Sequence, residues 1–375
     1  MKILLLNYEF PPLGGGASPV SYDIALRLST IGKFDIDVVT MHYRGLPRKE
    51  IINEHFTIYR VPSWRAKKEI CHPWEQLTYL ISGFFKCLSL IHKNKYNLCY
   101  CHFIIPTGVL AYLLKILFKL PYIITSHGSD VIKYNPRFKR IYPLITGVWK
   151  TILKNSLIIT TPSIFLARQI KNVYPKLDSN KIKIIPNGIE KNKFSPLKKE
   201  KTILLVTRIL LNKGVQVVLE AVKGTNINDW NIIIVGEGPA RKQLEILTRH
   251  YKLDKKVTFL GWVKNPSEKL RNLYGSASIF VLPSFFENMN VTLLEAMASG
   301  CAILATNVGG NPEVIGSAGI LFSPRNPAEL RKKLLDLINN EKNLSLFKQA
   351  SRIRFEKYFS WEIIIQEYLN VFCEK

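Results

Sequence analysis

Short, continuous apolar runs alternate with longer segments of helical periodicity along almost the whole sequence. Strands that consist of unbroken apolar runs are buried on both faces, and the helices between them supply the cover, so this alternation favours parallel sheets. A first series comprises ILLLN (3–7), IDVVT (36–40), FTIYRV (56–61), LCYCH (98–102), YIIT (122–125), LIIT (157–160) and IKII (182–185). A second comprises TILLVT (202–207), NIIIVG (231–236), VTFLG (257–261), SIFVL (278–282), AILAT (302–306) and GILF (319–322). The sequence therefore predicts two doubly wound α/β domains.

The stretch EKNKFSPLKKEK (190–201) separates the two series, because it is charged, lacks periodicity and carries Pro196. A chain of 375 residues also exceeds the size at which a single core keeps growing. The last segment, FSWEIIIQEYLNVFCEK, has Ser360 in N-cap position and an apolar helical face. We expect one domain over 1–195, a second domain over 196–358 and a final helix over 359–375.

The formal net charge is +25 and is unevenly distributed. Residues 1–195 contain 28 Lys and Arg against 11 Asp and Glu, whereas residues 196–375 contain 25 against 17. This excess favours an anionic partner for the first half: phospholipid, a phosphorylated substrate or nucleic acid. A lysine-rich surface that is simply solvated is the alternative.

Several features favour a reduced cytoplasmic protein. The six cysteines form no CxxC pair and have no His cluster beside them, which favours packing residues over a zinc site. The N-terminal apolar run ends at Asn7, too early for the core of a signal peptide. The most apolar long stretch, residues 107–125, is interrupted by Lys115, Lys119 and Pro121, which argues against a membrane span.

Ligands of doubly wound sheets bind beyond the carboxyl ends of the strands, and unusual residues follow several predicted strands of the first half. Gly14, Gly15 and Gly16 precede a predicted helix, where backbone amides could approach a phosphate, although a flexible turn explains them equally well. His102 ends one strand, and His127 follows the next within SHGSD. Two histidines at neighbouring strand ends favour a binding role over a purely structural one.

In the second half, Arg208 and Lys213 follow the strand at 202–207, where cations favour phosphate binding unless they are only solvated. The stretch PSFFENMNVTLLEAMASG (283–300) places Glu287 in a loop. A helix should run from Asn290 or Val291 to Gly300, with Glu295 about one and a half turns inside it. This layout suits a sugar, a diphosphate and a ribose in line, and the alternative is a core helix with an incidental acid.

These motifs occur in an order that resembles the family 4 retaining glycosyltransferases of GT-B fold. The most specific match is the E-x7-E block with its LEAMASG continuation. The others are PPLGGG, HGSD, IPNGIE, TRILLNKG, VGEGP, GGNPEVI and FSWE. The resemblance implies two Rossmann-like domains that face each other across a cleft: an acceptor-side domain over 1–195 and a nucleotide-sugar-binding domain over 196–358. It also implies that the C-terminal helix over 359–375 crosses back to the first domain.

The resemblance also implies catalytic roles for four residues. Arg208 and Lys213 resemble the pair that grips the donor diphosphate in place of a metal. Glu287 resembles the acid that bonds sugar hydroxyls, and His127 the residue near the C6 oxygen of the sugar.

Further donor contacts are implied for another six residues. Glu295 resembles the acid that holds the ribose. The remaining five are glycines of the acceptor and phosphate side or positions whose backbone amides meet the sugar and phosphate: Gly15, Gly16, Met289, Asn290 and Val291. Many members have Gly-Phe-Gly where this chain has Asn288-Met289-Asn290, a change that would reshape the sugar pocket.

The implied activity is transfer of a sugar from a UDP- or GDP-sugar to a glycan, lipid-linked or small hydroxyl acceptor, in surface polysaccharide, lipopolysaccharide or glycolipid assembly. We expect retention of configuration and no requirement for a metal or another cofactor. Two alternatives remain: a sugar-nucleotide epimerase of related fold, and a non-enzymatic polyanion binder. The sequence contains no DNA- or RNA-binding motif, so a nucleic acid partner is not expected.

Residues 64–95 predict peripheral attachment to the inner face of the cell membrane. This segment places Trp64, Trp74, Phe84 and Phe85 among six basic residues, and aromatic side chains suit the headgroup zone of an anionic bilayer. The alternative is an ordinary core helix with a solvated basic face.

Overall fold

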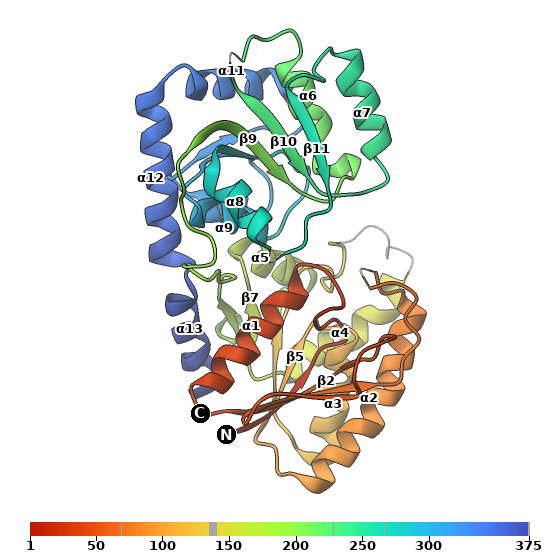
Figure 1. The fold of residues 1–375 in the computed structure, drawn as a ribbon. Coiled ribbons are helices and arrows are strands. Elements are labelled where there is room, and N and C mark those ends of the chain that lie inside the picture. Colours follow the sequence, from red (N-terminus) through yellow and green to blue (C-terminus); the bar gives the residue numbers. More distant parts are fainter. Residues whose placement is uncertain (69, 135–140, 228, 266, 374–375) are drawn as a thin grey trace. The chain divides into compact units, whose positions relative to one another are not determined.

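The computed structural model describes residues 1–68, 70–134, 141–227, 229–265 and 267–373, and the chain divides into two compact units (Figure 1). The first unit holds Met1–Ile185 and the C-terminal segment from Ile365, and the second holds Pro186–Ile364. The division falls before the boundary expected at 195/196, because Ile189 and Phe194 are buried in the core of the second unit. Within the expected linker at 190–201, Phe194 is therefore a core residue of the second unit.

The first unit contains an eight-stranded sheet in the order β3-β4-β2-β1-β5-β6-β7-β8. Its strands are β1 (Lys2–Leu6), β2 (Asp35–Met41), β3 (Lys49–Asn53), β4 (Phe56–Val61), β5 (Leu98–His102), β6 (Tyr122–Thr125), β7 (Ile159–Thr161) and β8 (Ile182–Ile184). The seven predicted strands are confirmed, and they pair in parallel. β3 was not predicted, because this polar edge strand lacks a continuous apolar run; it pairs antiparallel with β4.

Helices cover both faces of this sheet (Figure 1). They are α1 (Ala17–Thr30), α2 (Pro73–Lys93), α3 (Thr107–Phe118), α4 (Tyr142–Asn155), α5 (Ile164–Val173) and the short η2 (Ser179–Lys181). Buried side chains of α2, α3 and α4, such as Tyr79, Leu110 and Trp149, share one core with Leu4 and Leu6 of β1. No helix in the described part of the chain is both long and apolar enough to cross a membrane.

The second unit contains a six-stranded parallel sheet in the order β11-β10-β9-β12-β13-β14. Its strands are β9 (Glu200–Val206), β10 (Asn231–Val235), β11 (Val257–Gly261), β12 (Ala277–Leu282), β13 (Ala302–Thr306) and β14 (Ile320–Phe322), which confirms all six predicted strands. Its helices are η3 (Leu211–Lys213), α6 (Val215–Val222), α7 (Arg241–His250), α8 (Glu268–Ser276), α9 (Val291–Ala298), α10 (Asn311–Ile315), α11 (Pro327–Ile338) and α12 (Glu341–Tyr358). Alternate residues of β9 enter different cores: Ile203 and Leu205 join one, and Leu204 joins the other.

Each sheet has a point where the order of its strands reverses. In the first unit the chain proceeds from β1 through β2 to one edge and then returns to β5 on the other side of β1. In the second unit the chain proceeds from β9 through β10 to β11 at one edge and then returns to β12 on the other side of β9. Ligands of doubly wound sheets bind at the carboxyl ends of the strands at this switch point. The expected ligand sites are therefore the loops after β1 and β5 in the first unit and those after β9 and β12 in the second.

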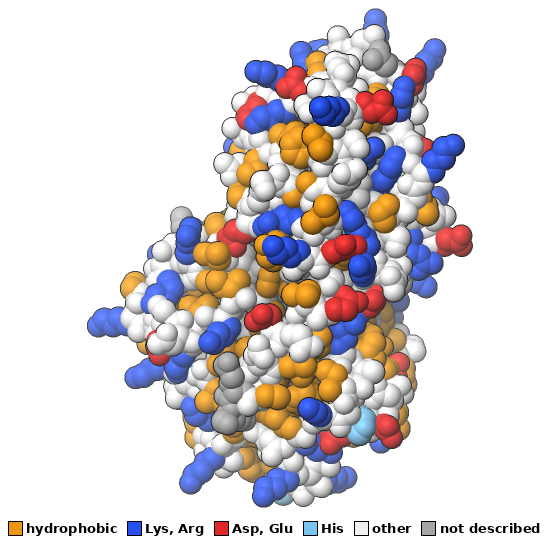
Figure 2. Space-filling model, turned by 90° about the vertical axis from the view of Figure 1, so that its left-hand side faces the viewer, with side chains coloured by type: hydrophobic (Ala, Val, Ile, Leu, Met, Phe, Trp, Pro, Cys, Tyr) orange, Lys and Arg blue, Asp and Glu red, His pale blue; other side chains and the backbone are white. Residues whose placement is uncertain are grey.

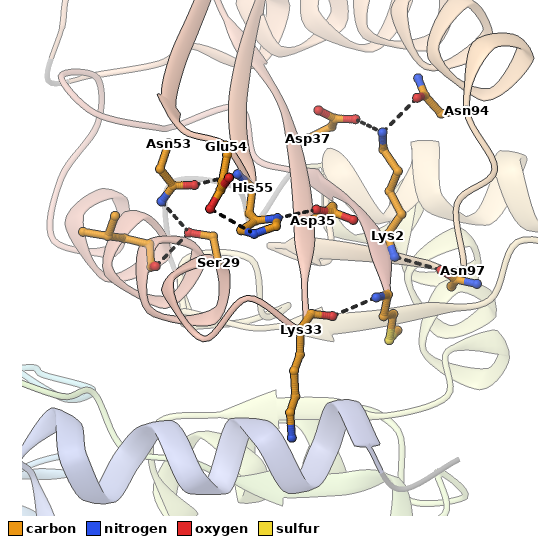
Figure 3. A network of polar contacts seen from close by, with 12 residues as sticks. Lys2, Ser29, Lys33, Asp35, Asp37, Asn53, Glu54, His55, Asn94 and Asn97 are labelled. Carbon is orange, nitrogen blue, oxygen red and sulfur yellow. Dashed lines mark hydrogen bonds and ion pairs between the residues drawn. The ribbon is translucent and has the colours of Figure 1, made fainter.

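A polar network lies at the opposite, amino end of the first sheet (Figure 3). Lys2 Nζ donates to Asn94 Oδ1 at 2.8 Å and lies 3.4 Å from Asp37 Oδ2, and the Lys2 amide donates to Asn97 at 2.8 Å. Nearby, His55 Nδ1 lies 2.7 Å from Asp35 Oδ1. These contacts fix the starts of β1 and β2, so the network has a structural explanation.

Helix α13 (Trp361–Cys373) begins in the second unit and ends in the first, as expected from the resemblance. At its start, the ring of Trp361 occupies the space that a Cβ at Gly188 would need, with a closest approach of 2.6 Å. The Ile189 amide donates to the Phe359 carbonyl at 3.0 Å. The IPNGIE and FSWE motifs therefore meet in the fold, which gives both a packing explanation.

The end of α13 completes the core of the first unit. The Phe372 ring lies 6.0 Å from that of Phe34 and 5.0 Å from that of Tyr100, and Phe372 is 1% exposed. Replacing Phe372 by Ala should lower the free energy of unfolding by about 3–5 kcal/mol, because a large buried side chain leaves a cavity. Urea unfolding would measure this loss, and Cys373→Ala, at the neighbouring exposed position, is the matched control. Equal stability of the two variants would contradict this role of α13.

Candidate functional site

The loop after β12 carries Glu287 and is attached to the loops on both of its sides. The Phe285 amide donates to the Asn212 carbonyl at 2.9 Å, and the Gly310 amide donates to the Asn288 carbonyl at 3.0 Å. The loops that follow β9, β12 and β13 are thus joined through their backbones. Glu287, in the middle loop, is therefore positioned by loops that extend from three parallel strands and not by its own loop alone.

Two glycines allow these loops to approach so closely. A Cβ at Gly214 would lie 1.9 Å from the Pro283 carbonyl oxygen, and one at Gly309 would lie 1.7 Å from that of Glu287. Both glycines also have positive φ, +76° and +56°. Any other residue at either position would displace the loop that carries Glu287.

The VGEGP turn after β10 has a similar function for the loop that carries Arg208. Cβ atoms at Gly236 and Gly238 would lie 1.8 Å from the Thr207 carbonyl oxygen and 2.2 Å from that of Ile209. No role in the site was predicted for this motif. The structure shows that it sets the position of the β9 loop.

Opposite charges meet at this switch point. Lys213 ends η3, and its Nζ lies 2.6 Å from Glu287 Oε1, with both side chains largely buried. Arg208 lies at the end of β9 and is exposed. The structure therefore brings three of the predicted catalytic residues to one end of one sheet. The ion pair between two of them was not predicted, because residues 74 positions apart give no local signal.

The N-terminus of α9 adds partial positive charge to the same loop. The predicted cap is confirmed: Asn290 Oδ1 accepts hydrogen bonds from the Thr292 amide at 2.9 Å and from the Thr292 hydroxyl at 2.7 Å. No described residue accepts a hydrogen bond from the amides of 289–291, so these donors can serve an anionic ligand. The Met289 sulfur contacts the Asn187 amide at 3.1 Å, which ties the loop to the IPNGIE segment.

Glu295 is buried within α9, at 2% exposure, and has a polar environment of its own. Its Oε1 accepts a hydrogen bond from Asn265 Nδ2 at 2.8 Å. Its Oε2 makes no well-formed hydrogen bond with a described residue, although the Tyr274 hydroxyl is close enough to interact with the carboxylate. Burial raises the pKa of this carboxyl, and the neighbouring polar groups partly oppose that rise. An incidental acid on a core helix would not have such partners.

The glycine loop of the first unit presents open backbone. Gly15 and Gly16 are exposed, and a Cβ at either would meet nothing within 4 Å. Gly16 occupies the N-cap position of α1 without a side-chain cap. Gly14 differs, because a Cβ there would overlap the Glu9 side chain and its amide donates to the Lys68 carbonyl at 2.8 Å. Gly14 therefore shapes the loop, and the next two glycines leave space at its end.

His127 lies after β6 in a loop that Asp130 organises. The Asp130 carboxylate accepts hydrogen bonds from the amides of His127 at 3.1 Å, Gly128 at 2.9 Å and Ile104 at 2.8 Å. Asp130 thus anchors the SHGSD loop to the segment after β5. Asp130 is the last residue of the SHGSD motif, and no function was predicted for it.

His127 and His102 form a stacked pair. His102 Nδ1 and His127 Nε2 are 2.9 Å apart, and the ring planes differ by 11°. Burial lowers the pKa of His127 to about 3 and that of His102 well below its ordinary value. Both rings are therefore neutral at pH 7, and one nitrogen of the contact donates to the other.

These depressed pKa values make folding sensitive to acid. Between about pH 6.5 and pH 3 the unfolded chain binds a proton at His127 that the folded chain does not, so the free energy of unfolding falls as pH falls. At pH 5 the loss from His127 should be about 2 kcal/mol, at about 1.4 kcal/mol per pH unit. Urea unfolding from pH 7 to pH 5 should show this slope, and His127→Gln should reduce it. The exposed His250→Gln is the control, and an unchanged slope in His127→Gln would exclude the mechanism.

The predicted site residues divide between the two units. The second unit gathers Arg208, Lys213, Glu287, Met289, Asn290 and Val291 around the carboxyl ends of β9 and β12, with Glu295 farther along α9. The first unit carries Gly15 and Gly16 after β1, and His127 after β6. Each group lies at or beside the switch point of its own sheet. Asn265 and Tyr274, the partners of Glu295, were missed, since an isolated Asn and Tyr have no recognisable spacing.

Two family models match the chain. Residues 14–193 match a model described as glycosyltransferase family 4, and residues 188–354 match one described as glycosyl transferases group 1. An uncharacterized glycosyltransferase of Methanocaldococcus jannaschii is 28% identical over 99% of this chain and 98% of its own.

Solved structures share the fold over the whole chain. Sucrose-phosphate synthase from Thermosynechococcus elongatus has a TM-score of 0.84 at 20% identity and full coverage of both chains. HepE of Anabaena, solved in complex with UDP-glucose, has a TM-score of 0.77 at 17% identity, also with full coverage. The matches favour neither the epimerase nor the polyanion binder. With adjoining models that together span residues 14–354, the chain belongs to the family 4 glycosyltransferases and is a glycosyltransferase of GT-B fold.

Proposed function

We propose that the protein transfers a sugar from a UDP- or GDP-sugar to a hydroxyl acceptor, with retention of configuration and without a divalent metal. The observation that carries this proposal is the arrangement at the switch point of the second unit. It combines two cations, a helix N-terminus and the carboxylate of Glu287 on loops that are joined through their backbones. The buried Glu295 lies farther along the same helix.

The charges suggest how a donor is bound. Arg208, Lys213 and the amides of 289–291 are suited to a diphosphate. Lys213 is paired with Glu287 at 2.6 Å, so a diphosphate would replace that carboxylate as the partner of the ammonium group. Glu287 would then accept hydrogen bonds from sugar hydroxyls. This exchange leaves neither largely buried charge without a partner.

The pair Glu295 and Asn265 is suited to a ribose. A buried carboxylate with an unused oxygen accepts hydrogen bonds from vicinal hydroxyls, and the Asn265 amide holds the other oxygen in place at 2.8 Å. The UDP-glucose complex of the Anabaena neighbour supports a nucleotide-sugar donor for this fold. The Asn288-Met289-Asn290 segment would determine which sugar is accepted.

The reaction would proceed on one face of the sugar. The bond from the anomeric carbon to the diphosphate oxygen breaks, and a bond to the acceptor oxygen forms on the same side. The leaving diphosphate oxygen takes the proton of the acceptor hydroxyl, so the products are a nucleoside diphosphate and a glycoside. Arg208 and Lys213 would stabilise the charge that grows on the leaving group, usually the largest contribution to catalysis.

The acceptor would be a glycan, a lipid-linked saccharide or a small hydroxyl compound, in polysaccharide, lipopolysaccharide or glycolipid assembly. In this proposal the first unit supplies its contacts. The open backbone at Gly15 and Gly16 and the neutral His127 are the groups there that could meet hydroxyls. Neutral groups suit an uncharged acceptor better than an anionic one.

Donor binding should raise the melting temperature. A nucleotide-sugar at a hundredfold excess over its dissociation constant should add about 2.7 kcal/mol of stability. We expect this from a UDP- or a GDP-sugar, equally with EDTA and with Mg²⁺, and an ADP-sugar serves as a comparison. Glu295→Gln should reduce this shift, because it weakens binding of the ribose. In turnover it should raise the KM for the donor more than it lowers kcat, because the ribose changes little during the reaction. No shift with any nucleotide-sugar would refute the proposed function, and a shift only with Mg²⁺ would refute metal independence.

Removing the cations should affect turnover more than binding. Arg208→Ala and Lys213→Ala should each lower kcat by about 10²-fold or more, because their partner gains negative charge in the transition state. Lys242→Ala, an exposed cation of α7, is the matched control and should keep the wild-type rate. Steady-state release of nucleoside diphosphate would measure kcat and the KM for the donor. Wild-type turnover in folded Arg208→Ala and Lys213→Ala proteins would reject the diphosphate assignment.

A further inference from the structure

Helix α2 exposes an apolar stripe along most of its length. Trp74, Leu77, Ile81 and Phe85 follow one another at helical spacing, and each is about half to two-thirds exposed. Trp64, just before the helix, is 72% exposed, and its ring lies 6.1 Å from that of Trp74. The opposite side of α2 is buried in the core of the first unit. The stripe is therefore additional to the face that the fold requires to be apolar.

The two neighbouring helices continue this surface. α2 packs against α3, and α3 packs against α4. The exposed apolar residues of the two are Leu113, Ile116, Leu117 and Phe118 on α3 and Leu144 and Val148 on α4, with Ile141 just before α4. At one end, the His92 ring of α2 lies 6.3 Å from the Phe118 ring. We call Trp64, the apolar stripe of α2 and these exposed apolar residues of α3 and α4 the α2–α3–α4 surface. Exposed apolar patches of this kind mark interaction sites.

The charge around the α2–α3–α4 surface is predominantly positive. Among the described residues of 62–154, eleven are Lys or Arg and only two are Asp or Glu. Both acids, Glu75 and Asp130, accept hydrogen bonds from backbone amides. By contrast, the face over α12 and α13 in Figure 2 mixes acidic with basic side chains. Basic residues around an apolar surface complement an anionic bilayer.

A second copy of the chain is a less suitable occupant. In a two-fold dimer the surface would face itself, and its basic residues would oppose one another with few acids to compensate. The two tryptophans at the start of α2 also suit the headgroup region of a membrane. Charge complementarity thus favours lipid over self-association.

The surface is connected to the glycine loop of the same unit. The Lys68 carbonyl accepts hydrogen bonds from the Gly14 amide at 2.8 Å and from Arg65 Nη2 at 2.9 Å. Arg65 is buried, and its Nη2 lies 3.5 Å from the carboxylate of Glu9, which precedes that loop in the sequence. Arg65 and Lys68, which follow Trp64, therefore support the loop that ends in Gly15 and Gly16. A membrane that contacts the tryptophans would hold this loop near its surface.

We propose that the α2–α3–α4 surface docks the first unit on an anionic lipid bilayer and that the acceptor is carried by a lipid in that bilayer. The second part rests on the proposed function, whereas the docking does not. Apolar side chains would enter the interface while surrounding Lys and Arg contact anionic headgroups. The acceptor saccharide would then extend from the membrane to the glycine loop.

Vesicle flotation tests the docking. The full chain should float with vesicles of phosphatidylcholine and phosphatidylglycerol and much less with phosphatidylcholine alone. The triple variant Leu77→Ser/Ile81→Ser/Phe85→Ser should lower the partition coefficient at least roughly tenfold, because it removes apolar groups from the interface. Lys93→Gln/Lys119→Gln should lower it roughly fivefold per residue, on anionic vesicles only. All five side chains lie on the solvent-exposed side of their elements, so folding should be unaffected.

The matched control replaces equally exposed apolar residues of the second unit. Ile353 is 64% exposed, as is Ile81, and the triple variant Ile246→Ser/Leu346→Ser/Ile353→Ser should bind vesicles like the wild type. Negligible flotation of the wild type with both vesicle types would overturn docking, as would equal loss in the two triple variants. A dimer that only the α2 variant dissociates, without flotation, would assign the surface to a second copy.

The assays separate this inference from the proposed function. The nucleotide-sugar thermal shift of the α2 triple variant should match that of the wild type, because the donor residues lie in the second unit. Loss of flotation with an intact shift supports docking, and flotation without any shift refutes the proposed function alone. Transfer to a vesicle-borne saccharide lipid, tested with both triple variants, checks the acceptor. Equal transfer by the two would refute the lipid-carried acceptor.

Discussion

Backbone contact between the loops after β9, β12 and β13 determines the arrangement of the candidate donor site. The contact depends on Gly214 and Gly309, whose missing side chains let carbonyl oxygens come within the space of a Cβ. Because the loops are joined, Lys213 and Glu287 reach each other at 2.6 Å although they belong to different loops. The positions of the charged groups therefore depend on backbone packing. The glycine motifs are as necessary to the site as the charged side chains.

Much of the fold follows from local sequence. Thirteen of the fourteen strands in the described part of the chain were predicted from short apolar segments, which are typical of parallel sheets covered on both faces. The α9 cap at Asn290 was also predictable, because N-caps have a strong side-chain preference. β3 escaped prediction, because an edge strand with a partly exposed face needs no apolar run. The two compact units divide at Ile185/Pro186, ahead of the expected boundary, because a charged segment can still contribute buried residues such as Phe194.

The candidate site was only partly predictable, and the difference has a physical origin. Positions after strands are fixed by topology, so Arg208 and Glu287 could be expected at one sheet end. Partners depend on distances between loops that no spacing in the sequence records. The ion pair of Lys213, the amide of Asn265 beside Glu295 and the anchoring by Asp130 all belong to this class. The resemblance supplied roles for single residues but not for these supporting contacts.

The two units differ in the polar groups that they could contribute to the proposed reaction: the first has neutral histidines, and the second has cations. His127 and His102 are neutral, because burial opposes their protonation, so His127 can form hydrogen bonds without adding positive charge. In the proposed reaction, Arg208 and Lys213 of the second unit would supply the positive charge for the departing diphosphate. If His127 were charged, it would attract phosphate to the acceptor-side unit and compete with those cations. In the proposed reaction, a neutral histidine pair would therefore leave His127 to hydrogen-bond hydroxyl groups and favour binding of the diphosphate by the cations of the second unit.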